Sequence, residues 1–123
     1  MKVYGYCRIS TSKQSMERQI RNIKLAYPDA VIVKETYTGT KIQGRKEFEK
    51  LLKIVSTGDT LVFDSVSRMS RTAQEGYEMY QKLYNQGVSL VFLKEPHINT
   101  STYQHAMENQ LSVNVKTGDQ ASE

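Results

Sequence analysis

Four short stretches of the chain have the alternating or continuously apolar pattern that is typical of β-strands. They cover residues 2–9, 30–37, 60–66 and 88–94. In the first stretch, alternation divides the side chains into two sets that face opposite sides of the strand. One set is Val3, Gly5, Cys7 and Ile9, and the other is Tyr4, Tyr6, Arg8 and Ser10. The division predicts that Ser10 lies on the same side as Arg8, whereas Cys7 belongs to the core, where free cysteine is usually found.

Apolar residues at helical spacing predict three helices, one after each of the first three strands. Their apolar positions are Met16, Ile20, Ile23 and Tyr27, then Phe48, Leu51, Leu52 and Val55, and finally an inner face of Tyr77, Tyr80, Leu83 and Tyr84. Pro28 would end the first helix, and Gly58 fits the C′ position of the second. Thr72 and Glu75 match the capping box that opens a helix, and Gly87 would end this third helix.

Single helices that alternate with strands predict an α/β fold with right-handed β–α–β units. The sheet would be mostly parallel, with four to five strands flanked by helices. In such sheets, functional groups lie just beyond the carboxyl ends of the strands. A further short helix is expected over 101–111. We therefore predict one domain over residues 1–111, followed by a polar tail over 112–123 that is disordered or truncated.

Composition and charge narrow the class of protein. The 123 residues carry a net charge of +4, which favours an anionic partner, most commonly nucleic acid, although charge alone is a weak indication. The single cysteine excludes an internal disulfide and a cysteine-rich zinc site. The N-terminus does not resemble a signal peptide, and no apolar run is long enough to span a membrane. We expect a cytoplasmic protein.

Arg8 and Ser10 leave the first predicted strand together at its carboxyl end. The planar guanidinium group of arginine pairs with phosphate oxygens two at a time, so this arrangement would place a hydroxyl beside a bound phosphate. Taken alone, the segment has a more ordinary interpretation. Serine often starts a turn or caps the following helix, and an exposed arginine is common.

Further candidates follow the other strands. Arg68 and Arg71 come directly after the third strand, and their i, i+3 spacing would put both side chains on one side of a helical turn, beside amides that attract phosphate. The alternative is a solvated pair without a partner. Arg45 opens the second helix, and Gln14 and Gln19 lie in or near the first. Considered singly, these three are ordinary surface residues, but either glutamine could hydrogen-bond a phosphate or the nearby loop.

The sequence has neither a GxxxxGK[ST] nor a GxGxxG nucleotide loop, and no cluster of metal ligands. We therefore expect no cofactor, and any chemistry would proceed without ATP, dinucleotide or metal. Phosphoryl transfer by positioning and arginine electrostatics meets this constraint. Asp64, late in the third strand, could orient an arginine. A Ser-His-Asp triad with His97 or His105 would need a fold geometry that the sequence does not provide.

Together, five motifs resemble the resolvase/invertase family of serine site-specific recombinases, over roughly residues 1–100. They are Tyr6–Ser15 (YCRISTSKQS), Gln19, Thr38–Arg45, Gly58–Phe63 and Ser67–Arg71 (SRMSR). Each motif is weak alone. Their common order and spacing resemble the N-terminal catalytic domain of the family, and this joint match favours a functional role for the arginines.

The resemblance implies a mechanism on double-stranded DNA. Ser10 would attack a phosphodiester to give a 5′-phosphoserine link and a free 3′-hydroxyl, followed by strand exchange and religation. The link keeps the energy of the phosphodiester, so no high-energy cofactor is needed. Gln14, Gln19 and Tyr6 would support the site. The residues that would neutralise the phosphate, one of which would also help to move a proton, are Arg8, Arg45, Arg68 and Arg71.

The chain departs from the family pattern in two ways. Ser67 stands where an acidic residue usually precedes the arginine motif, and Asp64 is a candidate to compensate. Family members also continue into a long helix for subunit pairing and then into a DNA-binding region, neither of which is recognisable here. We therefore expect a piece of a longer recombinase that is inactive alone, whereas the full-length parent acts as a homo-oligomer, from dimer to tetramer.

Two other functions stay open on the sequence. One is a non-catalytic module that keeps the recombinase fold and binds DNA phosphate, or serves assembly. Ser67 and the shortness of the chain favour it. The other is a metal-dependent nuclease, which is disfavoured because no pair of carboxylates has a suitable spacing.

Overall fold

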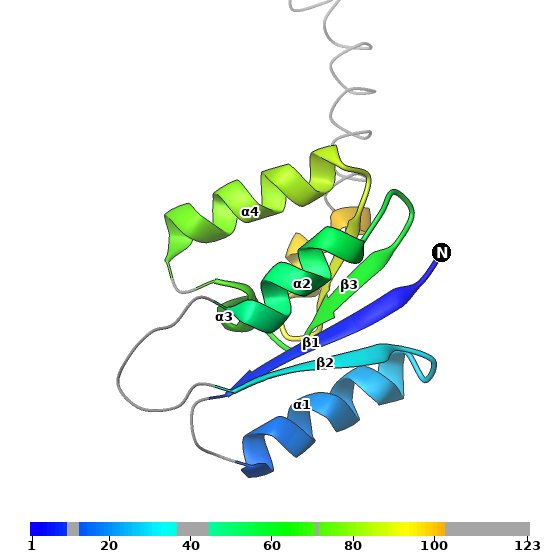
Figure 1. Cartoon of the computed structure of the whole chain (residues 1–123), viewed down its shortest axis with the longest axis vertical. Helices are drawn as coiled ribbons and strands as arrows, with labels where there is room; N and C mark the ends of the chain where they lie inside the picture. Colours follow the sequence, from blue (N-terminus) through cyan, green and yellow to red (C-terminus); the bar gives the residue numbers. More distant parts are fainter. Residues whose placement is uncertain (10–12, 37–44, 71, 103–123) are drawn as a thin grey trace, which may run out of the picture.

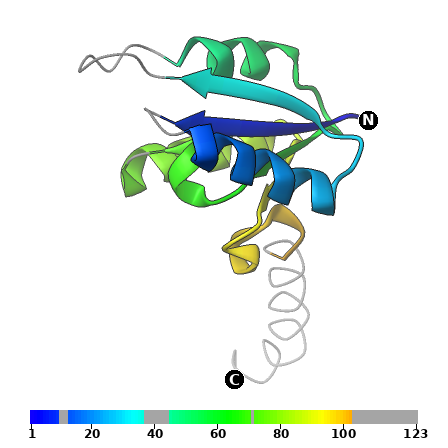
Figure 2. The ribbon, with the colours of Figure 1, turned by 90° about the horizontal axis from the view of Figure 1, so that it is seen from below.

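The computed structural model describes residues 1–9, 13–36, 45–70 and 72–102. Its strands are β1 (Val3–Ile9), β2 (Val31–Thr36), β3 (Thr60–Phe63) and β4 (Ser89–Phe92). They form a sheet in the order β2-β1-β3-β4, and every neighbouring pair is parallel (Figure 1). The predicted parallel sheet is therefore confirmed. The arrowheads of β1 and β2 point the same way (Figure 2), so the residues that follow these strands emerge at one edge.

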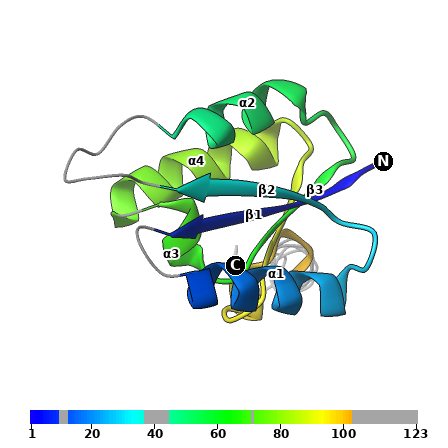
Figure 3. The same cartoon turned by 60° about the horizontal axis from the view of Figure 1, so that its bottom comes forward.

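Helices cover both faces of the sheet, as an α/β fold requires. They are α1 (Lys13–Ala26), α2 (Lys46–Ile54), α3 (Val66–Met69), α4 (Ala73–Asn85) and the 3₁₀ turn η1 (Pro96–Ile98). Helix α1 lies on one face, and α2 and α4 lie on the other (Figure 3). The short helix α3 follows β3 directly, so it lies at the carboxyl edge of the sheet.

The two-sided pattern predicted for the first strand is confirmed. Tyr6 packs into the core cluster that contains Phe48 of α2 and Leu83 of α4. Cys7 packs on the opposite face, in the cluster that contains Ile23 of α1. Cys7 is fully buried, and this burial raises the pKa of its thiol to about 12.

The ends of the helices agree with the sequence in part. At the start of α4, Thr72 Oγ1 accepts a hydrogen bond from the Glu75 backbone N–H at 3.1 Å, as the capping pattern predicts. Gly87 follows the last helical turn with a φ of +81°, which is also as predicted. The prediction for Gly58 is wrong. Helix α2 ends on an extended residue, Val55, and Gly58 has its φ of +95° in the turn before β3.

The region between β3 and α4 also differs from the prediction. β3 ends at Phe63, three residues before the predicted end of the strand, and Val66 already begins α3, earlier than the helical turn considered for Arg68 and Arg71. The prediction that Tyr77 faces inward from α4 is wrong, since 65% of this residue is exposed. Tyr77 lines a groove of about 620 Å³ between α3, α4 and η1, together with Met69 and Ile98.

Several predictions fall outside the described residues. These are residues 38–44 of the Thr38–Arg45 motif, residues 103–111 of the expected short helix, and the tail over 112–123. In the described part of the chain, no helix is long and apolar enough to cross a membrane. Across the same residues, His, Cys, Asp and Glu side chains do not gather in a group of three that could hold a metal ion.

We predict that Cys7 is unreactive in the native protein and becomes reactive on unfolding. Its raised pKa keeps the thiol protonated near pH 9, where an exposed thiol is largely the reactive thiolate. Because ionisation favours the unfolded chain, the contribution of the thiol to stability is complete below about pH 9 and decreases as the pH rises toward 12.

The rate of reaction with dithionitrobenzoate, in buffer and in urea, tests the predicted reactivity of Cys7. Equal rates under the two conditions would contradict it.

Candidate active site

Gln19 of α1 fixes the backbone of Arg8 near the carboxyl end of β1. Its Oε1 accepts a hydrogen bond from the Arg8 N–H at 3.1 Å, and its Nε2 donates to the Arg8 carbonyl at 3.2 Å. β3 pairs with β1 only as far as Tyr6, and the Gln19 amide provides the hydrogen bonds beyond that point. The Gln19 side chain is fully buried, so it sets the position from which the chain continues toward Ser10.

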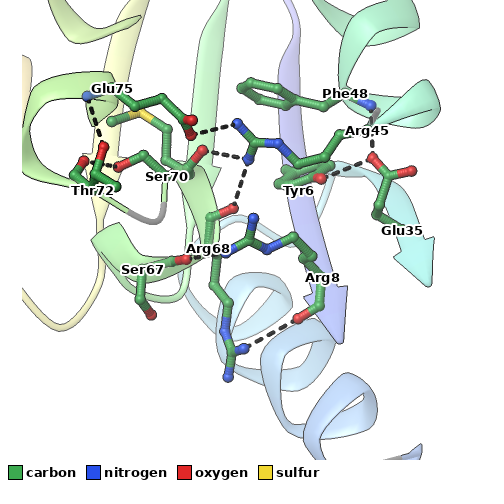
Figure 4. Close-up of polar contacts among 11 residues, drawn as sticks. Tyr6, Arg8, Glu35, Arg45, Phe48, Ser67, Arg68, Ser70, Thr72 and Glu75 are labelled. Carbon is green, nitrogen blue, oxygen red and sulfur yellow. Dashed lines mark hydrogen bonds and ion pairs between the residues drawn. The ribbon is translucent and has the colours of Figure 1, made fainter. Parts of the chain in front are cut away.

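Arg8 and Arg45 reach the same short helix from different elements (Figure 4). Arg8 Nη2 donates to the Ser67 carbonyl. Arg45 Nη1 donates to the Met69 carbonyl and lies 3.4 Å from the Arg68 carbonyl. Carbonyl groups at the end of a helix carry partial negative charge and favour cations. Helix α3 therefore holds two guanidinium groups near each other through its backbone.

Arg68 points from α3 back toward β1. Its Nη1 donates to the Arg8 carbonyl at 3.2 Å, and its Nη2 lies 3.4 Å from Ser15 Oγ. Its Nε is buried and has no hydrogen-bond partner among the described residues. Of the carboxylates in the described residues, none forms an ion pair with Arg68. The cluster therefore retains positive charge and a hydrogen-bond donor that an anionic ligand would satisfy.

A buried carboxylate connects β2, β1 and α2 close to the arginines. Glu35 of β2 accepts hydrogen bonds from the Tyr6 hydroxyl at 2.8 Å and from the Phe48 and Glu47 backbone N–H groups at 3.0 and 3.1 Å. These amides belong to the first turn of α2, where a carboxylate is favourable. Burial, with the hydrogen bond to Glu35, raises the pKa of the Tyr6 phenol above its ordinary value. Glu35 thus anchors the helix that Arg45 precedes.

The model of the resolvase N-terminal domain matches residues 3–116. The chain belongs to the family of resolvase N-terminal domains. The resemblance that the sequence motifs indicate is therefore confirmed, and the arginine cluster lies within the matched region.

Three relatives of this resolvase domain are themselves called resolvases. The transposon Tn501 resolvase of Pseudomonas aeruginosa is 34% identical over 93 residues, which cover 74% of this chain and 46% of that protein. The transposon Tn21 resolvase of Escherichia coli is 32% identical over 107 residues, or 85% and 53% of the two chains. A resolvase of Clostridium perfringens is 30% identical over 98 residues, or 79% and 51%. The chain spans about half the length of these relatives.

Two solved structures of recombinases resemble this chain, and each match covers nearly all of it. A resolvase family site-specific recombinase from Streptococcus pneumoniae has a TM-score of 0.61 and 25% identity, and the match covers 100% of this chain and 99% of that one. A serine recombinase from Sulfolobus solfataricus has a TM-score of 0.59 and 22% identity, with 98% and 85% coverage. At 22% identity, the likeness to the Sulfolobus solfataricus structure shows a shared fold and nothing further.

The structure brings together only part of the predicted site of this resolvase domain. Tyr6, Arg8, Gln19, Arg45 and Arg68 lie around α3 and the end of β1. Ser10 and Arg71 lie outside the described residues, so their place in the cluster stays a prediction. Gln14 is exposed on α1 and is not joined to the cluster by any hydrogen bond among the described residues.

Asp64 does not have the predicted role. Its carboxylate accepts a hydrogen bond from Asn22 Nδ2 at 3.0 Å and pairs with Lys94 Nζ at 3.3 Å. Among the described residues, both oxygens therefore contact α1 and the segment after β4 rather than an arginine, so the prediction is wrong for Arg8, Arg45 and Arg68. Glu35 was missed because an acidic residue near the end of a strand is usually solvated. The one available signal was its position just before the Thr38–Arg45 motif.

We predict that Glu35→Gln lowers the free energy of unfolding by about 1–3 kcal/mol. The NH₂ group of the new amide cannot accept a hydrogen bond, so it would face the hydroxyl of Tyr6 or the backbone N–H groups of α2 without a partner. Glu47→Gln is the matched control. It removes the same charge from the same region, but breaks only the exposed 3.5 Å pair with Lys50, so it should change the unfolding free energy by less than about 0.5 kcal/mol. Urea unfolding measures both values. A Glu35→Gln protein as stable as the control would refute the anchoring role.

Proposed function

We propose that this chain is the catalytic domain of a site-specific DNA recombinase in which Ser10 is the nucleophile. The observation that carries the proposal is a cluster of three arginines at the edge of the sheet where β1 leads to Ser10: Arg8 and Arg45 donate to carbonyls of α3, and Arg68 reaches from α3 to the end of β1. A cluster with this excess of positive charge suits a phosphodiester. Membership of the resolvase family supports the same substrate.

In the proposed reaction, Ser10 Oγ forms a bond to a DNA phosphorus and the bond from phosphorus to the 3′ oxygen breaks. The serine hydroxyl loses a proton and the leaving 3′ oxygen gains one. Attack by a 3′-hydroxyl on the phosphoserine reverses both changes after strand exchange. Because the number of phosphoester bonds stays constant, no cofactor is required.

The arginines would stabilise the transition state by charge. Arg8 and Arg45 are already held by α3 carbonyls, so they need little reorganisation when charge develops on the phosphate oxygens. Arg71 would join them, and one of these arginines would assist the proton transfers. Gln14 and Gln19 would support the site. Tyr6 would support it from within the core, because its hydroxyl donates to Glu35 and its raised pKa keeps the phenol neutral.

The proposed reaction implies that the protein acts on DNA as an oligomer. Each Ser10 forms one covalent link, whereas recombination of two duplexes cuts four strands, so the parent protein would act as a homo-oligomer up to a tetramer. Its substrate would be double-stranded DNA. The relatives named above come from bacteria, in which DNA lies in the cytoplasm, and this is the location that we propose.

The covalent intermediate provides the test. We expect the chain, fused to a DNA-binding module whose site flanks a nicked target, to form an SDS-resistant protein–DNA adduct. Ser10→Ala should reduce its yield at least about a thousandfold, since the nucleophile is removed. Ser101→Ala, which changes an exposed serine in the segment after η1, is the matched control and should leave the yield unchanged. An adduct that survives in Ser10→Ala would exclude Ser10 as the nucleophile.

The same assay separates the rival functions. EDTA should have no effect on adduct formation, whereas loss of cleavage with EDTA would indicate a metal-dependent nuclease. A protein that binds the target but forms no adduct, under conditions in which a related resolvase does, would favour the non-catalytic module.

A further inference from the structure

Glu75 forms an ion pair with Arg45, whereas the sequence pattern assigns Glu75 only a role in capping α4. In a capping box, the acidic side chain turns back to the backbone N–H of the N-cap residue. The Glu75 backbone N–H does donate to Thr72 Oγ1. Its carboxylate, however, lies 3.4 Å from Arg45 Nη2 (Figure 4), and it makes no return bond to Thr72 among the described residues. The Glu75 carboxylate therefore interacts with Arg45 rather than with the backbone at the start of α4.

Arg45 is oriented from three sides. The Phe48 ring lies 4.5 Å from the guanidinium carbon, the Met69 carbonyl accepts from Nη1, and Glu75 faces Nη2. Glu75 is the only one of these neighbours that carries a charge. Two contacts on different nitrogens fix the plane of the guanidinium group, because rotation in that plane would break one of them.

Contacts with Ser70 hold the first turn of α4, which carries Glu75. Ser70 Oγ donates to the Thr72 carbonyl at 3.3 Å. Gly76 packs directly against this serine, since a Cβ on Gly76 would lie 2.5 Å from Ser70 Oγ. The same segment runs from α3 to α4 through Arg71. The turn that carries Glu75 is thus tied to the helix whose carbonyls hold the arginines.

The Glu75 carboxylate is not retained for stability. Its side chain is 48% exposed, and ion pairs of this kind contribute little to folding. A weak, exposed pair can still bias the orientation of the guanidinium group, because Glu75 contacts Nη2 whereas the α3 carbonyls contact Nη1. We propose that Glu75 is a positioning residue that fixes the guanidinium group of Arg45 for phosphate binding. This inference rests on the proposed function, because it assigns Arg45 to the phosphate.

Phosphate affinity provides the test, because orientation and charge act on it in opposite directions. Loss of a nearby negative charge should by itself tighten the binding of an anion. If Glu75 positions Arg45, Glu75→Ala should instead weaken the binding of inorganic phosphate to the 123-residue chain, by about two- to fivefold. Glu75→Gln, which keeps an acceptor without the charge, should lie between Glu75→Ala and the unchanged protein.

Glu78→Ala is the matched control. Glu78 lies one turn further along α4 and contacts Gln74 at 2.8 Å rather than an arginine. Its loss removes the same charge from the same helix, so phosphate binding should be unchanged or slightly tighter. The Arg45 Nε–Hε cross-peak, assigned with Arg45→Lys, should change in Glu75→Ala and not in Glu78→Ala. Urea unfolding should give equal midpoints for both variants.

Two results would overturn the inference. One is a Glu75→Ala protein that binds phosphate as tightly as Glu78→Ala or more tightly. The other is an Arg45 cross-peak that is the same in the two variants. The adduct assay keeps this inference separate from the proposed function. A fusion that forms no adduct in any variant would count against recombinase chemistry, whereas the phosphate titration would still decide whether Glu75 positions Arg45.

Discussion

The backbone carbonyls of α3 accept hydrogen bonds from Arg8 and Arg45, and the geometry of the site depends on this contact. Like charges repel, so guanidinium groups stay close only where acceptors surround them. A helix of four residues does not persist by itself, and its neighbours must hold it. Glu95 does so at one end, where its carboxylate accepts from the Val66 N–H at 2.9 Å. Met69 is buried at the other end.

The dependence on backbone carbonyls bears on Ser67, which stands where the family resemblance leads us to expect an acidic residue. The contact to Arg8 uses the Ser67 carbonyl, which every residue type has, so it does not depend on the side chain. The Ser67 hydroxyl instead lies 2.8 Å from Ser65 Oγ. Carboxylates reach this region from elsewhere, through Glu75 to Arg45 and through Glu95 to the start of α3. The acidic groups around α3 are therefore distributed over α4 and the segment after β4.

The sequence was sufficient to predict the orientation of side chains in elements with a regular hydrophobic period. Alternation in β1 placed Arg8 opposite Cys7 because each strand residue must face one side or the other. It was insufficient where a contact is single and distant. Glu35 meets Tyr6 across 29 positions, and no local pattern marks such a pair. Helix α3 is about one turn long, which is too short to show a period. Tyr77 belonged to the apolar stripe of α4 but faces the groove, because a stripe does not reveal which of its members lacks a neighbour.

Arg68 carries a hydrogen-bond donor that the described part of the chain leaves unpaired. Its Nε is buried without a partner there, and a group in this state costs about 1–3 kcal/mol. The side chain cannot simply turn to pair this atom, since its Nη atoms are held by the Arg8 carbonyl and Ser15. A phosphate oxygen would supply the missing acceptor and a counter-charge together, whereas a neutral ligand would supply only the acceptor. The orientation of Arg68 therefore supports the proposed phosphate site.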